Sequence, residues 1–224
     1  MQVNILYRPA HTLAQVWLSA NESVIAESGA MIGMTPNVQI QTQAGGLMKG
    51  LKRLFGGESF FRNTFTASGG NGEVLLAHSL CGDIASLEMT QQGYFIQSSC
   101  FIASSSGVEI DSKWGGAKGF FSGAGLVTLK ATSNGPGQVI VGAFGGIQEI
   151  PINGDFVIDT GHLVAWDASL TYKIGKSGSG WIASFFSGEG LVCHFQGQGR
   201  VWIQTRNSAG YGQEVGALLP PRKE

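Results

Sequence analysis

The stretch FSGAGLV at residues 121–127 recurs as FSGEGLV at 186–192, and FGGESFF at 55–61 keeps the phenylalanine, the second glycine and the closing apolar pair. A second glycine turn follows each stretch and leads into an apolar run: GEVLL at 72–76, GQVIV at 137–141 and GRVWI at 199–203. Three ordered pairs of turns, spaced by about 65 residues, indicate an internal repeat that fills almost the whole chain. The repeat turn residues are Gly57, Gly123, Gly125, Gly188 and Gly190.

The segments between these turns have the period of strands. VQIQ at 38–41 and VTLKA at 127–131 alternate apolar and polar residues, which is typical of half-buried strands. Short β-like segments at 24–26, 94–96 and 163–165 precede the three copies, and glycine clusters at 68–72, 133–137 and 197–199 predict tight turns between strands. The best helical pattern is at 47–55, where leucines lie on one face and basic residues opposite.

These patterns predict a mainly β fold with few short helices. We expect a single domain over residues 1–219, made of three β modules at about 20–88, 90–157 and 158–212 around a pseudo-threefold axis, and a loose tail at 220–224. Modules of this size bury too little surface to be stable alone, so they should pack against one another.

Charge, cysteine content and hydropathy limit the function classes. Among the 224 residues, 14 Lys and Arg oppose 15 Asp and Glu, and the net charge of −1 argues against nucleic acid as a partner. Cys81, Cys100 and Cys193 lack a C-x-x-C spacing, so we expect free thiols in a reducing compartment. The first residues lack a signal-peptide pattern and no apolar run could form a transmembrane segment, so we expect a cytoplasmic location.

The run DTGHLVAW at 159–166, the two FSGxGLV stretches and GGI at 145–147 resemble the altered-inheritance-of-mitochondria family of uncharacterised proteins. Its bacterial members are soluble, and its mitochondrial members are linked to inner-membrane organisation. The likeness covers nearly the whole chain. It implies an all-β fold likened to a shortened double-stranded β-helix or sandwich, as in the tryptophan RNA-binding attenuation protein. It implies no catalytic residues; the family-motif residues are Asp159, Thr160, Gly161 and His162.

Motifs for catalysis are weak. The four histidines are isolated in sequence, so H-x-H and H-E-x-x-H metal patterns are absent, and we expect no metal and no cofactor. Asp159, His162 and Asp167 could form an acid–base pair, but D-T-G more simply predicts a turn closed by the aspartate side chain. GSGWIA at 178–183 matches G-x-G-x-x-A without the strand and helix that a dinucleotide site needs. We therefore expect no enzymatic activity, and a cupin-like metal enzyme is the weakest alternative.

Two function classes remain open. A scaffold could use the apolar and aromatic residues beside each F-x-G turn, together with a basic cluster in the first copy, to contact an unknown protein partner or the membrane periphery. A small-ligand- or RNA-binding β module is the alternative, and burial of the same side chains as plugs of the modules is equally consistent with the pattern. Oligomerisation is left open. The candidate contact residues are Lys49, Leu51, Lys52, Arg53, Leu54, Phe55, Trp114, Phe120, Phe121, Trp181, Phe185 and Phe186.

Overall fold

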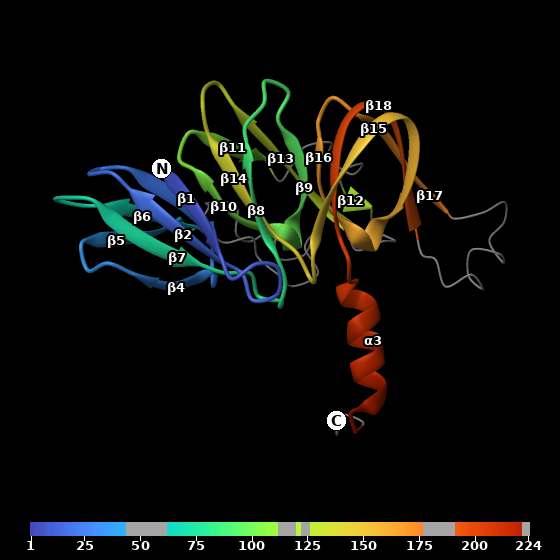
Figure 1. The fold of residues 1–224 in the computed structure, drawn as a ribbon, viewed down its shortest axis with the longest axis horizontal. Helices are drawn as coiled ribbons and strands as arrows, with labels where there is room; N and C mark the ends of the chain where they lie inside the picture. The colour runs from blue at the N-terminus through green and yellow to red at the C-terminus, as the bar shows by residue number, and fades with distance from the viewer. Residues whose placement is uncertain (44–61, 112–119, 122–125, 177–190, 221–224) are drawn as a thin grey trace.

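The computed structural model describes residues 1–43, 62–111, 120–121, 126–176 and 191–220. The described chain is mainly β, as the sequence predicted, and its strands form three antiparallel sheets. Figure 1 shows the strands following one another along the long axis of the molecule, from the N-terminal strands at one end to β15, β17 and β18 at the other.

The sheets combine strands from distant parts of the sequence. The first sheet has the order β1 (Gln2–Leu6), β2 (Leu13–Leu18), β7 (Gly72–Leu76), β4 (Met31–Met34). The second has the order β5 (Val38–Gln43), β6 (Arg62–Ala67), β3 (Ser23–Glu27), β10 (Phe101–Ser105), β14 (Gln138–Gly142), β8 (Ile84–Glu88). The third has the order β11 (Val108–Asp111), β13 (Leu126–Ser133), β9 (Tyr94–Gln97), β16 (Leu163–Asp167), β18 (Leu191–Gln204), β15 (Ile147–Asp159), with β12 (Phe120–Phe121) beside β13 and β17 (Thr171–Lys176) beside β18.

Alternating burial along the strands builds three apolar cores. In β2 and β7 every second side chain is buried, because successive residues of a strand point to opposite faces of the sheet. The first core joins the first and second sheets and contains Val16, Phe65, Val74, Ile102 and Ile140. The second and third cores lie further along the molecule around Tyr94, Trp202 and Trp166. Each core therefore depends on side chains from strands that are far apart in sequence.

One pairing arrangement occurs three times. β7 lies between β2 and β4, β14 lies between β8 and β10, and the end of β18 lies between the start of β15 and β16. In each case one flanking strand carries a register shift near its start. The shifts fall between Met31 and Gly33 in β4, Phe101 and Ala103 in β10, and Leu163 and Ala165 in β16.

In each arrangement, a glycine of the second glycine turn lies close to an apolar side chain. A Cβ atom on Gly72 would lie 2.6 Å from Cγ2 of Val38, and one on Gly137 would lie 2.9 Å from Cγ2 of Val108. On Gly199 it would lie 2.9 Å from Cγ of Leu170. A buried apolar side chain thus fills the space above each glycine. The predicted repeat, its pseudo-threefold axis and the module boundaries stay predictions.

Two details of the third copy differ from the sequence-based interpretation. The predicted turn at 197–199 is wrong, because β18 continues through it from Leu191 to Gln204, whereas 68–71 and 134–137 do separate two strands. The sequence analysis treated 163–165 as the equivalent of 24–26 in β3 and 94–96 in β9. In the structure, 163–165 pairs with the end of β18, whereas β3 pairs with β6 and β9 pairs with β13. Residues 155–159 of β15 pair with the first part of β18, as β3 pairs with β6 and β9 with β13. Because β15 and β18 are each continuous, the sequence did not show that 155–159 is the equivalent segment.

A helix that the sequence analysis did not predict ends the described chain. In α3 (Ser208–Leu218) the Asn207 side chain caps the start, its Oδ1 accepting from the backbone N of Ala209 at 2.9 Å and of Gly210 at 3.3 Å. None of its residues is buried, and Figure 1 shows it projecting away from the sheets. Three glycines lower its intrinsic helix propensity, which is why composition did not reveal it. The helix predicted at 47–55 and residues 221–224 lie outside the described residues.

Candidate functional site

Most residues that the sequence proposed for partner binding lie outside the described part of the chain. Phe120 and Phe121 are described as the two residues of β12, which pair with Val127 and Leu126. The others outside the description are Lys49, Leu51, Lys52, Arg53, Leu54, Phe55, Trp114, Trp181, Phe185 and Phe186, together with the turn residues Gly57, Gly123, Gly125, Gly188 and Gly190. Their role in binding stays a prediction.

The family-motif residues form a tight turn, η3 (Thr160–His162), between β15 and β16. Asp159 Oδ1 accepts from the backbone N of Gly161 at 2.7 Å, which confirms the turn predicted for D-T-G. Nδ1 of His162 lies 2.7 Å from the carbonyl oxygen of Gln204, and Gln204 Nε2 donates to the carbonyl of Gly161 at 3.0 Å. The motif thus ties the turn to the end of β18.

Two further contacts extend this junction. The Thr160 hydroxyl donates to the carbonyl of Leu191, 2.9 Å away, at the start of β18. Gly161 faces the side chain of Asn207, and a Cβ atom there would clash with it. Because Asn207 caps α3, the motif residues connect β15, β18 and the helix start. In the described structure their contacts are those of a structural junction.

The proposed acid–base pair is not assembled in the described contacts. Asp159 caps the turn, His162 contacts Gln204, and Asp167 binds Arg200, so the three have separate partners. Within the described ranges no three His, Cys, Asp or Glu side chains come together as a metal-binding group. The absence of enzymatic activity stays a prediction.

A charged cluster that the sequence did not reveal lies beside β16 and β18. Asp167 Oδ2 accepts from the backbone N of Arg200 at 2.7 Å and from its Nε at 3.2 Å. Arg200 Nη2 donates to the Tyr94 hydroxyl at 3.3 Å, and the guanidinium carbon lies 4.8 Å from the ring centroid of Trp202. The hydrogen bond to Asp167 and its charge raise the pKa of Arg200 above its ordinary value. Every group of this cluster has a partner inside the fold, which indicates a structural role.

The first sheet carries the clearest candidate binding site, an apolar pocket of about 440 Å³. Tyr7 and Ile32 line it and are strongly exposed, at 72% and 60%. The remaining wall is mostly apolar and is formed by His11, Thr12, Leu13, Leu75, Ala77, His78, Ser79, Leu80, Cys81 and Gly82. Such a surface can hold an apolar group and offers few fixed charges.

A buried carboxylate fixes the loop that carries Tyr7. Asp83 accepts from Arg8 through two hydrogen bonds, Oδ1 from Nε at 2.9 Å and Oδ2 from Nη2 at 2.7 Å, and from the Thr12 hydroxyl at 3.3 Å. These hydrogen bonds raise the pKa of Arg8 above its ordinary value. Tyr7 has φ +58°, a left-handed conformation that is uncommon for a bulky residue and is found where a structure positions a functional side chain. The loop therefore presents Tyr7 in a defined place.

His78, on the pocket wall, has both ring nitrogens occupied. Nε2 lies 2.8 Å from the carbonyl oxygen of Ser99, and the backbone N of Leu80 lies 3.3 Å from Nδ1. Nδ1 also lies 3.3 Å from the carbonyl oxygen of Leu80, so both ring nitrogens contact the backbone. His78 thus connects the pocket wall near Leu80 to the backbone at Ser99.

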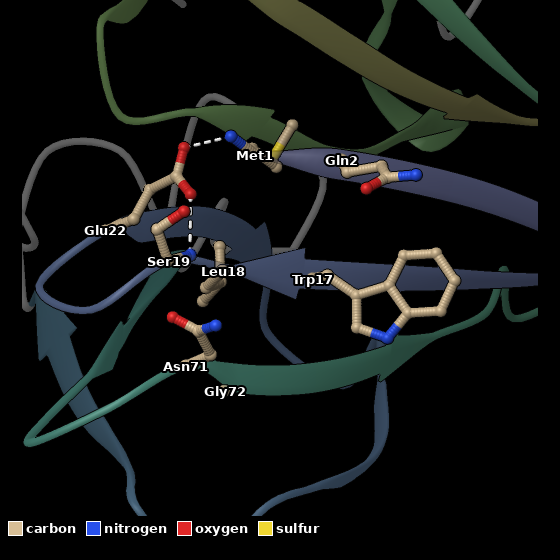
Figure 2. Close-up of a pocket in the computed structure, with 8 residues that line it drawn as sticks. All are labelled: Met1, Gln2, Trp17, Leu18, Ser19, Glu22, Asn71 and Gly72. Carbon is tan, nitrogen blue, oxygen red and sulfur yellow. Dashed lines mark hydrogen bonds and ion pairs between the residues drawn. The ribbon is translucent and has the colours of Figure 1, made fainter.

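A second cavity, of about 570 Å³, lies at the other end of the first sheet. Figure 2 shows Trp17 along one side and Glu22 bridging the backbone N of Ser19 and the amino group of Met1. Burial of Glu22 opposes ionisation, but these hydrogen bonds outweigh it and lower the pKa of the carboxyl group. The polar atoms of Glu22 are engaged within the fold, and Trp17 is the exposed apolar feature of this cavity.

The three cysteines are free thiols, as predicted. Cys81 is exposed, whereas Cys100 and Cys193 are buried, and burial raises the pKa of both to about 12. Only Cys81 among them combines exposure with a place at the candidate pocket.

No helix in the described part of the chain is long and apolar enough to cross a membrane.

Comparison with known proteins identifies relatives of this chain and of its fold. The chain is 30% identical over 218 residues to an uncharacterised protein of Streptococcus pyogenes serotype M6, covering 93% of this chain and 87% of that protein. A crystal structure of a Streptococcus pyogenes protein matches with a TM-score of 0.79 at 27% identity, over 97% of this chain and 99% of that chain. The family model described as mitochondrial biogenesis AIM24 matches residues 3–206, which span all three sheets and stop short of α3. The chain therefore belongs to the mitochondrial biogenesis AIM24 family.

Proposed function

We propose that this protein is a non-enzymatic binding protein, and that the exposed apolar side chains of its first sheet contact a protein partner. The supporting observation is their concentration: Tyr7, Trp17, Met31, Ile32 and Met34 are all large, apolar and more than a third exposed, and all come from the first 34 residues. Exposed apolar side chains gathered on one part of a folded protein commonly mark an interaction site.

The local chemistry agrees with binding. Arg8, next to Tyr7, is held by two hydrogen bonds to Asp83, so the backbone that carries Tyr7 has little freedom to lose when a partner packs against it. A row of hydrogen bonds, from Asn4 to Gln15 and from Gln15 to Glu73, crosses the outer face of the sheet and would lie within the same footprint. Apolar side chains combined with satisfied polar groups are the usual composition of a protein interface. The aromatic segments around Phe55, Phe121 and Phe186 belong to this proposal as a predicted extension of the surface.

The test uses two surface variants and a matched control. Tyr7→Ser and Ile32→Ser remove exposed apolar area from the pocket, and Ile40→Ser removes a side chain that is 41% exposed on β5 of the second sheet. Affinity capture with quantitative mass spectrometry should show a protein retained by the native chain and by Ile40→Ser but depleted at least tenfold with the other two. Equal capture by all four would reject this surface. Flotation with anionic vesicles forms the second arm, and binding there that depends on Tyr7 and Ile32 would replace the protein partner with a membrane.

The pocket itself favours a second candidate function, the binding of a small apolar ligand. Its volume of about 440 Å³ lies within the range that small molecules occupy. Ala77→Leu would fill part of it. Native mass spectrometry of the protein purified from its native cells should then reveal a bound mass in the natural chain that is lost in Ala77→Leu. If no bound mass is found in either, this second function is rejected.

A further inference from the structure

The second cavity of the first sheet combines an aromatic side chain with two amides. Trp17, Gln2 and Asn71 are among its lining residues, and Figure 2 shows them together with Glu22. Its volume of about 570 Å³ lies within the range of small-molecule sites. Trp17 is 38% exposed, and Gln2 and Asn71 are exposed as well. The cavity therefore offers a flat apolar surface and polar groups that a ligand can reach.

The register of the first sheet fixes what lies beside Trp17. Gln2 in β1 and Glu73 in β7 are both directly opposite Trp17 in β2. Directly opposite residues of antiparallel strands project from the same face, with Cβ atoms about 4.5–5.5 Å apart. Gln15 Nε2 donates to Glu73 Oε1 at 2.5 Å, which holds this carboxylate in place. Trp17 is thus flanked by an amide on one side and a fixed carboxylate on the other.

The two amides of the cavity have no partner among the described residues. No hydrogen bond there engages the side-chain amide of Gln2 or of Asn71. The backbone of Asn71 is nevertheless fixed, because its carbonyl oxygen accepts from Asn37 Nδ2 at 3.0 Å. A side-chain amide carries both a donor and an acceptor, so each one can bond two neighbouring hydroxyl groups of a ligand.

The charges at the cavity favour an uncharged ligand. Glu22 forms an ion pair with the amino group of Met1, and these two are the charged groups among the described lining residues. Glu73, opposite Trp17, adds a negative charge nearby. A phosphate or carboxylate ligand would therefore meet a carboxylate without an unpaired cation among the described lining residues. An uncharged ligand avoids the large cost of removing a charge from water.

We propose that this cavity binds a neutral carbohydrate, with one face of a pyranose ring packed on Trp17 and neighbouring hydroxyl groups bonded to Gln2 and Asn71. This site goes beyond the proposed protein contact. Trp17 belongs to the exposed apolar residues assigned to that contact, but Tyr7 and Ile32, by which the contact is tested, line the other cavity.

A pyranose ring has the two properties that this cavity combines. In a glucose-type ring the hydroxyl groups lie around the edge, and the two faces carry C–H bonds. These C–H bonds have a partial positive charge, and the face of an indole ring is negative, so the two surfaces attract each other. The hydroxyl groups at the edge both donate and accept, as the amides of Gln2 and Asn71 do. A tryptophan beside two amides thus complements both the face and the edge of the ring.

The first experiment observes Trp17 directly by NMR of the nitrogen-15-labelled chain. The chain has five tryptophans, and the indole N–H signal of Trp17 is the one that is missing from Trp17→Phe. Cellotriose, a trimer of β-linked glucose, should shift this signal with a Kd on the order of 1 mM. Mannitol, which has hydroxyl groups but no ring, should shift it at least tenfold less at the same concentration.

The second experiment measures the affinity of variants for cellotriose from the NMR signals of the sugar. Trp17→Leu keeps an apolar residue but removes the ring, so its affinity should fall at least tenfold. Asn71→Asp keeps the side-chain shape but removes the amide donor, and its affinity should fall at least threefold. Tyr7→Ser is the matched control, because this exposed aromatic residue lines the other cavity, and it should bind as the natural chain does. Signal dispersion in the protein spectra shows that each variant is folded.

Three outcomes would overturn the inference. The first is a Trp17 signal that none of cellotriose, chitotriose and maltotriose shifts at about 20 mM. The second is cellotriose binding that is unchanged in both Trp17→Leu and Asn71→Asp, which would place the sugar elsewhere. The third is a shift by adenosine without one by any of the three sugars, which would replace the carbohydrate with another planar ligand. None of these results affects the capture test with Tyr7→Ser, so this inference and the proposed function fail separately.

Discussion

Gly154 and Gly197 lie opposite each other in the ladder of β15 and β18, with φ values of +111° and +123°. The two strands pass this point together without a break, and 13 residue pairs keep one register from Ile147 to Asp159. The left-handed backbone on both sides is the feature that lets two long strands change direction together, since an L side chain is strained there.

The first prediction concerns this pair. A Cβ atom at Gly154 would meet nothing within 4 Å, so Gly154→Ala should lower the free energy of unfolding through backbone strain alone, by about 1–3 kcal/mol. Gly175→Ala, in β17 with the same open space and no positive φ, is the matched control and should change stability by less than about 1 kcal/mol. Urea denaturation measures both, and equal losses would contradict the assignment of strain.

The second prediction concerns the close approach of Gly72 and Val38. Gly72→Ala should destabilise the protein by about 1–3 kcal/mol, because the new methyl group would overlap Cγ2 of Val38. Val38→Ala creates space but loses packing. The double variant should therefore be more stable than the sum of the single losses predicts, by about 0.5–3 kcal/mol. Additive losses in a urea double-mutant cycle would show that the two sites do not interact.

The third prediction concerns the family motif. Thr160→Val keeps the side-chain shape but removes the hydroxyl of a buried residue that donates to the part-buried carbonyl of Leu191. The expected loss of unfolding free energy is about 1–3 kcal/mol. Thr171→Val, at an exposed site on β17, should stay within about 0.5 kcal/mol of the natural chain. A Thr160→Val protein as stable as the control would exclude a structural role for this hydroxyl.

The fourth prediction concerns the thiols. At pH 8 a disulfide reagent should modify one cysteine, Cys81, in each folded chain and all three after unfolding. In the Cys81→Ser variant it should modify no cysteine in the folded chain and two after unfolding. Modification of a second thiol in the folded natural chain would contradict the burial of Cys100 and Cys193.

The same two thiols make stability depend on alkaline pH. Their folded-state pKa, about 12, lies above the usual value of about 8.5 in an unfolded chain. Their contribution is therefore complete below about pH 8.5 and is lost as pH rises toward 12. Urea midpoints measured across this range should fall, and the fall should be smaller in Cys193→Ala. An unchanged slope in that variant would argue against the raised pKa of Cys193.

Local sequence patterns predicted the β class because they report directly on strand period and turns. The runs that begin at Gly72, Gly137 and Gly199 do occupy equivalent pairings, and at each glycine an apolar neighbour leaves no room for a Cβ atom. The continuity of β18 through Gly197 was not predictable, because a glycine that bends a strand and one that ends it look alike in sequence.

The candidate pocket was missed for a different reason. The placement of Tyr7 depends on Arg8 and Asp83, which are 75 residues apart, and no local pattern connects them. A lone aspartate between glycine and an apolar segment, as in GDIA at 82–85, was the only trace of a buried carboxylate. Ile32 is exposed because, among the described strands, only β7 pairs with β4. The order of strands in a sheet cannot be read from a local sequence pattern.

The division of strands among the three sheets determines the order in which the sheets can form while the chain is being synthesised. The first sheet uses only residues up to Leu76, so its pairing is complete in the emerging chain well before the others. The second sheet waits for β14 near residue 142, and the third for β18 near residue 204. Until β10 emerges, β3 is an uncovered edge on a ribosome-bound chain, open to mispairing with a neighbouring nascent chain. We therefore expect translation speed between residues 76 and 105 to affect the yield of folded protein.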